Sequence, residues 1–195
     1  MYEVEVKVRA DHDEVRDRLA ELGAEPVNEV VQEDTYYDAP HREFAETDEA
    51  LRVREERVTG DDKTPDAGEP SDDPTTELTY KGPLVEAESK TRREVETAVA
   101  DGAAADAILD ALGFAPAATV RKERRRYAVD GFTVTIDAVE GLGEFVEVET
   151  EVEGSDSVPA ARERAYGILR EVGLDPDDQI RTSYLGLLLE SEPGA

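Results

Sequence analysis

A strict alternation of charged and apolar residues recurs along this chain and constrains its fold more than any other feature. Between Glu3 and Arg9 every odd position is charged and every even position is valine. A period of two residues is that of a β-strand, whose successive side chains point to opposite faces. Similar patterns predict further strands over residues 30–38, 49–58, 77–82, 91–99, 119–129, 132–139 and 144–152. Strand after strand therefore has one charged face and one apolar face.

The segments between these strands predict helices and one long loop. Apolar residues at helical spacing, or an alanine-rich run at 103–112, predict helices over residues 12–22, 103–112, 159–172 and 178–190. Residues 60–76 are rich in Gly, Asp, Pro, Ser and Thr, so we expect a mobile acidic loop that lengthens a hairpin. We expect residues 1–190 to form a single domain and residues 191–195 a frayed tail.

The charged strand faces contain more bases than the overall composition would lead one to expect. The chain has 49 acidic and 22 basic residues, a net charge of -27, and only five of the bases are lysine. A water-exposed face in such a chain should be nearly all Asp and Glu, yet Lys7, Lys81 and Lys122 lie on predicted strands. We infer an enclosed polar lumen: a closed or nearly closed antiparallel barrel, charged inside and apolar outside, with helices over its outer surface.

The composition also excludes several kinds of partner and site. Nucleic acids and anionic membranes are poor partners for an acidic surface, because both need a basic footprint. The absence of cysteine excludes disulfides and thiolate metal sites. No stretch is apolar enough to span a membrane and no apolar signal region follows Met1, so we expect a cytoplasmic protein. The scarcity of lysine and the excess of carboxylates suit a cytosol of very high salt.

Acids and bases that share one lumen predict a particular chemistry. Converging bases suit a polyanion, and phosphate fits Arg and Lys best. The basic members of the charged faces are Lys7, Arg52, Arg54, Lys81, Arg92, Lys122, Arg124 and Arg126. The acidic members are Glu3, Glu5, Glu94, Glu96, Asp137, Glu147 and Glu149. Carboxylates cannot bind phosphate directly, but they can bind Mg²⁺ or Mn²⁺, which bridges to phosphate oxygens. The residues thus predict a metal-dependent site for a polyphosphate or a nucleoside triphosphate.

The chain resembles the CYTH family, also called the triphosphate tunnel metalloenzymes, in blocks that run through nearly its whole length. The first block is Glu3-Val4-Glu5-Val6-Lys7, the Glu-x-Glu-x-Lys hallmark of the family's first strand. The later blocks follow in the family's order: Thr35–Asp38, Leu51–Arg54, Leu78–Pro83, Arg92-x-Glu94-x-Glu96, Lys122-x-Arg124-x-x-Tyr127, Asp137–Gly143, Glu147-x-Glu149 and Ser183-Tyr184. The resemblance implies an α+β fold, an eight-stranded antiparallel β tunnel with helices packed on the outside.

Within the family the chain looks most like the class IV adenylyl cyclase type, at Leu78–Pro83 and Gly141–Glu149. The resemblance implies an enzyme that converts ATP to cyclic AMP and pyrophosphate with Mg²⁺ or Mn²⁺ as cofactor, and it implies roles for individual residues. The implied metal ligands are Glu3, Glu5, Asp137, Glu147 and Glu149. The implied triphosphate-binding residues are Lys7, Arg52, Arg54, Lys81, Arg92, Lys122 and Arg124. Lys7 and Glu147 are the expected catalytic residues.

Two other functions stay open on the sequence. The same lumen would serve a triphosphatase acting on thiamine triphosphate, tripolyphosphate or a nucleoside triphosphate, because only the attacking nucleophile differs. A non-catalytic module that binds a triphosphorylated ligand is the third reading, and the full set of acids argues against it. A homodimer is the default expectation for the oligomeric state.

The alternation leaves the inward-facing residue undecided wherever two similar side chains are neighbours. Only one member of each pair can face the lumen in Arg92-Arg93, Arg125-Arg126 and Tyr36-Tyr37. Tyr184 is expected to be a core or tunnel-rim aromatic residue rather than a catalytic group.

If the acidic shell is an adaptation to salt, the melting temperature will rise as KCl is raised into the molar range. At 1 M salt the screening length falls to about 3 Å, so repulsion between surface carboxylates is largely removed. Thermal unfolding followed by circular dichroism at several KCl concentrations checks this. A melting temperature that stays level or falls would contradict the adaptation.

Overall fold

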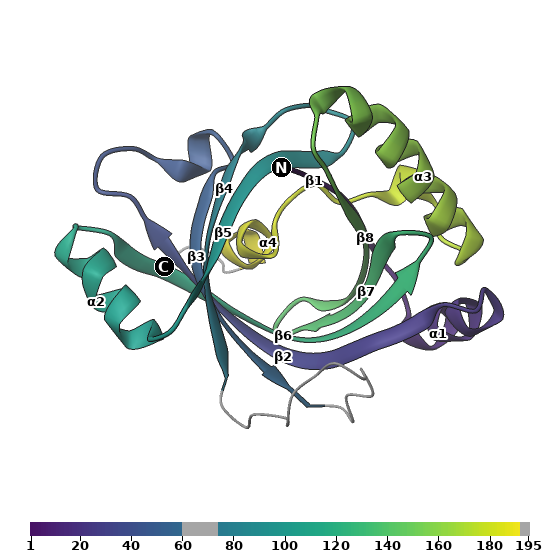
Figure 1. Cartoon of the computed structure of the whole chain (residues 1–195), viewed down its shortest axis with the longest axis horizontal. Helices are drawn as coiled ribbons and strands as arrows, with labels where there is room; N and C mark the ends of the chain where they lie inside the picture. Colours follow the sequence, from purple (N-terminus) through teal and green to yellow (C-terminus); the bar gives the residue numbers. More distant parts are fainter. Residues whose placement is uncertain (60–73, 192–195) are drawn as a thin grey trace.

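Eight antiparallel strands close into a barrel in the computed structural model, which describes residues 1–59 and 74–191 (Figure 1). The strands are β1 (Tyr2–Arg9), β2 (Glu25–Asp38), β3 (Ala50–Val58), β4 (Thr75–Leu84), β5 (Lys90–Val99), β6 (Ala115–Val129), β7 (Phe132–Val139) and β8 (Gly143–Val152). Their order around the barrel is β1-β5-β4-β3-β2-β6-β7-β8, and β8 pairs with β1 to close it. The predicted eight-stranded tunnel is confirmed.

The strand register brings charged residues opposite one another on the inner face. Lys7 of β1 lies opposite Glu147 of β8, and Arg124 of β6 lies opposite Asp137 of β7. A slip of one residue would turn every side chain of a strand to the other face. The alternation seen in the sequence therefore fixes which face of each strand is turned inward, and it excludes a slip by an odd number of residues.

The main hydrophobic core lies outside the barrel, between its wall and two helices. α1 (His12–Glu21) begins after Asp11, whose side chain accepts a hydrogen bond from the backbone N–H of Asp13 at 2.9 Å. α3 (Val158–Glu171) has Pro159 in its first turn. Both helices lie on the outer side of the barrel wall in Figure 1. The buried side chains of this core are Val6, Val8, Val15, Leu19, Val134, Ile136, Val146, Val148, Ala165, Ile168, Leu169 and Val172.

The two remaining α-helices occupy different places on the barrel. α2 (Gly102–Ala111) buries Leu109 against Val53 on the outer wall. α4 (Tyr184–Ser191) is seen within the ring of strands in Figure 1, and Tyr184 packs with Val139 and Phe145 near one end of the barrel. α4 therefore covers one end of the tunnel. No helix among the described residues is long and apolar enough to cross a membrane.

The predicted helix over residues 178–190 is wrong in its first part. A 3₁₀ turn, η3 (Pro176–Asp178), ends where the helix was expected to begin, and α4 starts only at Tyr184. Between them the backbone N–H of Ile180 donates to the carbonyl of Lys7 on β1 at 2.7 Å. This contact holds the segment alongside the barrel instead of in a helix. The other three predicted helices agree with α1, α2 and α3 to within one residue at each end.

Two strands begin earlier than predicted, and two expected segments fall largely outside the description. β2 begins at residue 25 rather than 30, and β6 at residue 115 rather than 119. The ladder between them shifts register between Pro26 and Asn28, and such an irregularity accommodates a residue without an N–H. β4 begins at Thr75, so the end of the expected loop over 60–76 is strand, while residues 60–73 lie outside the described residues. The expected tail begins one residue too early, because Ser191 belongs to α4 and only residues 192–195 lie beyond the description.

Truncation of Ile168 to alanine should lower the free energy of unfolding by about 2–5 kcal/mol, because it leaves a cavity in the core between α3 and the barrel. Ile108→Ala on α2 is the matched control, since this side chain is 60% exposed and its loss should change stability by only about 0.5 kcal/mol. Urea unfolding of both variants makes the comparison. Equal losses would contradict the placement of the core.

Candidate active site

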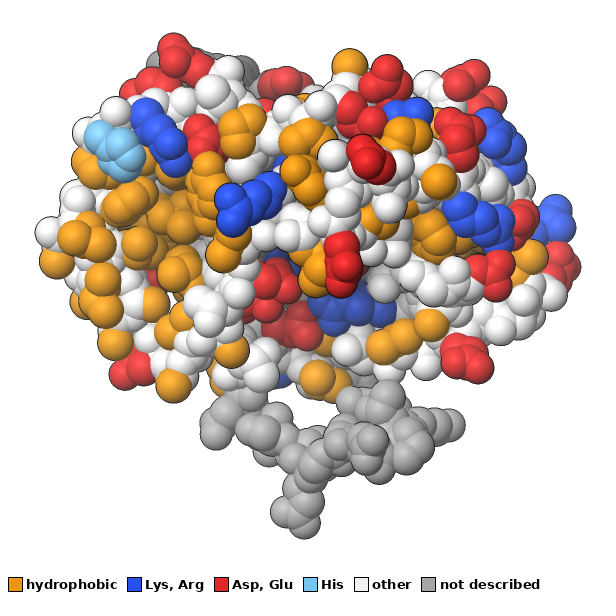
Figure 2. Space-filling view, turned by 45° about the horizontal axis from the view of Figure 1, so that its top comes forward, with side chains coloured by type: hydrophobic (Ala, Val, Ile, Leu, Met, Phe, Trp, Pro, Cys, Tyr) orange, Lys and Arg blue, Asp and Glu red, His pale blue; other side chains and the backbone are white. Residues whose placement is uncertain are grey.

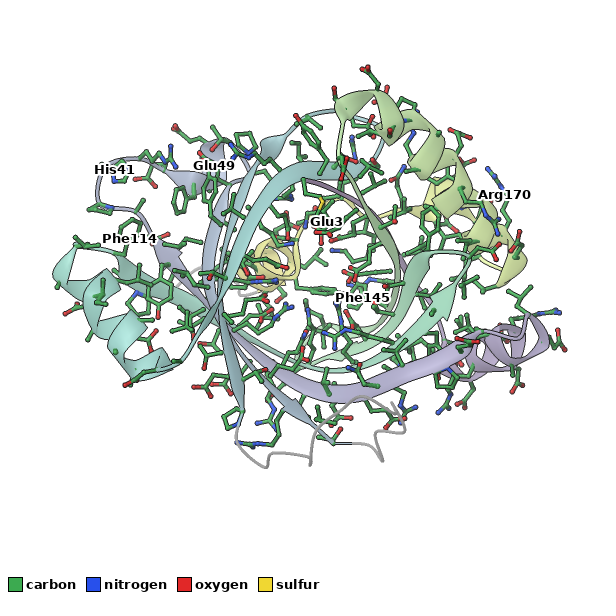
Figure 3. All side chains as sticks on the ribbon, in the orientation of Figure 1. Glu3, His41, Glu49, Phe114, Phe145 and Arg170 are labelled. Carbon is green, nitrogen blue, oxygen red and sulfur yellow. The ribbon has the colours of Figure 1, made fainter. Side chains whose placement is uncertain are left out.

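One cavity of about 900 Å³ runs into the barrel and receives side chains from all eight strands. Figure 2 shows acidic and basic side chains together in a hollow of the surface, and in Figure 3 Glu3 points into the ring of strands. The wall of the cavity includes these predicted site residues: Glu3, Glu5, Lys7, Arg52, Arg54, Lys81, Arg92, Lys122, Arg124, Glu147 and Glu149. Asp137, the remaining one, is completely buried and bonded to Arg124. The structure thus gathers the whole predicted set around one cavity.

Three glutamates meet at one point of the cavity wall. Glu3 and Glu5 of β1 and Glu149 of β8 each offer a carboxylate oxygen, and these three oxygens lie within 4.8 Å of one another. Oε1 of Glu5 is buried and accepts no hydrogen bond from the described residues. Burial raises the pKa of Glu149 to about 7, and the charge of Glu3 adds to the rise. Carboxylate oxygens gathered at one point, one of them without a hydrogen-bond donor, suit a divalent cation. We call these three residues the glutamate triad.

The other two predicted metal ligands are paired with an arginine. Arg124 donates from Nε to Oδ1 of Asp137 at 2.7 Å and from Nη2 to Oδ2 at 2.5 Å. Its Nη2 also donates to Glu147. Although burial opposes ionisation, the charges of Arg124 and Lys7 hold the pKa of Glu147 well below its ordinary value. Glu147 is therefore held ionised, and it shares the guanidinium of Arg124 with Asp137.

Tyr184 joins α4 to this charged network. Its hydroxyl donates to Oδ2 of Asp137 at 2.9 Å, and the centre of its ring lies 4.3 Å from Nζ of Lys7 and 5.1 Å from Nζ of Lys122. Each ammonium group is attracted by the quadrupole of the aromatic ring. The sequence placed Tyr184 in the core or at the rim, and its contact with both lysines depends on where α4 lies.

Asp34 of β2 is a site residue that the sequence reasoning missed. It accepts hydrogen bonds from Nε and Nη2 of Arg54 at 2.5 and 2.7 Å, and its Oδ2 lies 3.6 Å from Arg52 and 3.7 Å from Lys122. Burial opposes ionisation, yet the charges of Arg54, Arg52 and Lys122 hold the pKa of Asp34 far below its ordinary value. One carboxylate thus keeps three of the predicted phosphate-binding bases together. Its position two residues before Tyr36 on the inner face was the available signal.

Two further bases of the wall are held by acids. Lys81 of β4 lies 3.0 Å from Glu3 and also contacts Glu94, so it links the glutamate triad to β5. Arg92 of β5 donates to the backbone carbonyl of Asp48 at 2.7 Å and to its carboxylate at 2.9 Å. The sequence predicted Lys81 and Arg92 for the site, but it gave no sign of Asp48, which lies in the connection between β2 and β3.

Lys90, the first residue of β5, was also missed. It is 7% exposed and lines the cavity. Burial, and then the charge of Lys7, lower the pKa of Lys90 to about 7. Four of the chain's five lysines therefore line the cavity: Lys7, Lys81, Lys90 and Lys122. The fifth, Lys63, lies outside the described residues. The available signal was its parity, because Lys90 lies two residues before Arg92.

The structure decides the three ambiguous pairs of neighbours. Arg92 faces the cavity and Arg93 is exposed. Arg126 lines the cavity and pairs with Glu56 at 2.7 Å, whereas Arg125 pairs with Glu29 on the surface. Arg92 and Arg126 are therefore the inward arginines, and Tyr36 lies among the charges of Asp34 and Arg52. Tyr37 also borders the cavity, but its hydroxyl donates to Asp106 of α2 on the outer side.

A closed tunnel of eight antiparallel strands, with carboxylates and bases on its inner wall, defines the class of protein. The chain belongs to the CYTH domain family, whose model matches residues 1–184. The chain is 36% identical over 188 residues to "Putative adenylate cyclase MJ0240" of Methanocaldococcus jannaschii, covering 96% of this chain and 98% of that protein. It is 29% identical over 192 residues to "Adenylate cyclase CyaB" of Aeromonas hydrophila, covering 97% and 90%. The structure of the PH1819 protein from Pyrococcus horikoshii is 41% identical with a TM-score of 0.85, covering 97% of this chain and 99% of that one.

Replacing Asp34 with asparagine should lower the free energy of unfolding at pH 7 by about 3–5 kcal/mol, because it leaves buried cations without their carboxylate. The pKa of Asp34 is lower in the folded chain than in the unfolded one, so its contribution is present above about pH 4 and is lost as the pH falls further. The stability gap between the wild type and Asp34→Asn should therefore narrow on acidification.

Glu33→Gln is the matched control, because Glu33 is the exposed neighbour on the outer face of the same strand. Urea unfolding of the three proteins between pH 7 and pH 3 makes the comparison. A gap that is absent at pH 7, or that widens in acid, would contradict the assigned ion pairs.

Proposed function

We propose that this chain is a divalent-metal-dependent enzyme acting on a triphosphate, of the class IV adenylyl cyclase type, which converts ATP to cyclic AMP and pyrophosphate. The observation that carries the proposal is that the glutamate triad and the wall's lysines and arginines share one buried cavity. The names of the two relatives give the cyclase reaction priority over other reactions of a triphosphate.

The residues of the wall fit Mg²⁺ or Mn²⁺ as the cofactor. Glu3, Glu5 and Glu149 would hold the ion, since both metals prefer carboxylate oxygens. When bound, the metal would lower the pKa of the attacking hydroxyl and neutralise charge on phosphate oxygens. Asp137 and Glu147 would complete the ligand set if Arg124 turned from them toward the phosphates.

Three bases are the best placed to take phosphate oxygens without giving up a short ion pair. The carboxylates nearest to Lys7, Arg52 and Lys122 lie 3.6–3.9 Å away, beyond ordinary hydrogen-bond distance. Nε of Arg52 is buried with no hydrogen-bond partner among the described residues. The other proposed triphosphate-binding residues hold acceptors at 3.0 Å or less and would exchange them for phosphate: Arg54, Lys81, Arg92 and Arg124.

In the cyclase reaction the ribose 3′-oxygen attacks the α-phosphorus, the bond from that phosphorus to the bridging oxygen breaks, and pyrophosphate leaves. Lys7, Arg52 and Lys122 would neutralise the charge that develops on the leaving pyrophosphate. The buried wall would fix the triphosphate relative to the attacking hydroxyl and exclude bulk water. Most of the rate enhancement would thus come from positioning and from charges organised in advance.

Incubation with ATP and Mg²⁺ or Mn²⁺ should yield cyclic AMP and pyrophosphate in equal amounts, separated and quantified by liquid chromatography. Parallel incubations with thiamine triphosphate and tripolyphosphate test the hydrolase reading, in which water attacks the terminal phosphorus. Orthophosphate without cyclic AMP would identify a triphosphatase instead. Binding without any turnover would identify a non-catalytic module.

Glu147→Gln should reduce turnover by about 100-fold or more while the fold survives, because the charge that organises Lys7 and Arg124 is removed. Arg124 keeps its paired hydrogen bonds to Asp137 in this variant. Glu153→Gln, at an exposed position just after β8, is the control and should turn over as the wild type does. Full activity in Glu147→Gln would count against the assignment.

A further inference from the structure

Lys90 differs from every other base of the cavity wall in its partners. Each of the other bases has a carboxylate oxygen within 4.0 Å: Lys7, Arg52, Arg54, Lys81, Arg92, Lys122, Arg124 and Arg126. Lys90 has none among the described residues, although it is 7% exposed. A buried ammonium without a counter-ion is costly, so its retention in a lysine-poor chain calls for a ligand.

The backbone around Lys90 is held firmly from outside the barrel. The turn between β4 and β5 is closed by a hydrogen bond from the N–H of Val85 to the carbonyl of Thr91 at 2.9 Å. Arg162 of α3 donates to Glu86 at 2.7 Å, and the hydroxyl of Tyr166 donates to the carbonyl of Glu88 at 2.7 Å. These contacts fix the start of β5 against α3. The direction of Lys90 into the cavity is thus set before any ligand arrives.

The surroundings of Lys90 are those of an anion site beside a metal site. Lys90 lies opposite Glu5, a member of the glutamate triad, on the neighbouring strand. The positive charges of Lys7 and Arg92 repel the ammonium of Lys90, and the negative charge of Glu5 only partly offsets them. Lys90 in turn helps Lys7 and Lys122 to stabilise the ionised form of Glu147. An anion at this point would meet several cations and would lie next to a metal held by the triad.

We propose that Lys90 is an additional phosphate-binding residue, which takes an oxygen of the phosphoryl group that also contacts the metal at the glutamate triad. This inference rests on the proposed function. Lys90 is thus an addition to the bases that the resemblance implies. Its ammonium group need not leave a carboxylate in order to bind phosphate. Arg54, Lys81, Arg92 and Arg124 would exchange a short contact for phosphate, and Lys7, Arg52 and Lys122 keep a carboxylate at 3.6–3.9 Å, whereas Lys90 gains its first partner.

This role makes two predictions of opposite sign for Lys90→Met, which removes the charge but keeps the length of the side chain. The affinity for a bis-methylene analogue of tripolyphosphate, which neither hydrolase nor cyclase chemistry cleaves, should fall by about tenfold or more in the presence of Mg²⁺. The melting temperature of the ligand-free protein should rise, because an unpaired buried charge has been removed. Isothermal titration calorimetry and thermal unfolding measure the two effects.

Arg93→Met is the matched control, since it removes one positive charge from the exposed face of the same strand. It should leave both the affinity and the melting temperature near the wild-type values. Affinity unchanged in Lys90→Met, or lowered as much in Arg93→Met, would overturn the role of Lys90. A fall in both affinity and melting temperature would mark a structural role and would also overturn it. Absence of binding by the wild type would overturn the proposed function together with this inference.

Discussion

The interior of the tunnel has to balance its own charge, and the rest of the structure depends on this constraint. A charge removed from water is costly unless an opposite charge or hydrogen-bond donors stand beside it. Asp34 neutralises bases on one side of the cavity, and Arg124 neutralises Asp137 and Glu147 on another. The glutamate triad has only Lys81 beside Glu3 and Lys7 at 3.8 Å from Glu5, and among the described residues Glu149 and Lys90 have no opposite charge within 4.0 Å. The carboxylates of the glutamate triad thus lie beside the ammonium group of Lys90. A metal ion bound to the carboxylates and a phosphate bound to Lys90 would balance both charges.

One sequence period builds both the core and the cavity. The valines of β1 pack outward against α3, while the charged residues between them line the tunnel. The barrel therefore has its hydrophobic core on the outside and its charges on the inside, and the helices are needed to keep the outer face dry. The net charge of -27 is that of the whole chain, with 22 bases to 49 acids, whereas the cavity wall has nine bases to twelve acids. An acidic protein can in this way offer a group of bases to a polyanion.

The sequence could predict the strands, three of the four α-helices and most of the charged residues that line the cavity. It could do so because alternation indicates which side chains share a face. The family itself came from the ordered blocks, not from the alternation. Asp34 and Lys90 were not predicted as site residues, because each lies in a stretch where charged residues do not alternate cleanly with apolar ones. The pairing of Arg124 with Asp137 depends on strand register, and the contacts of Tyr184 depend on Ile180 bonding to Lys7. Such contacts join distant segments, and local patterns carry no information about them.

The most direct test of the charged tunnel as a metal-dependent triphosphate site is a crystal structure with Mn²⁺ and the noncleavable tripolyphosphate analogue. Anomalous scattering locates the manganese independently of the protein. The account predicts manganese among the carboxylates of Glu3, Glu5 and Glu149, with phosphate oxygens on Lys7 and Lys90. Manganese bound elsewhere on the acidic surface, or an analogue lying outside the cavity, would contradict it.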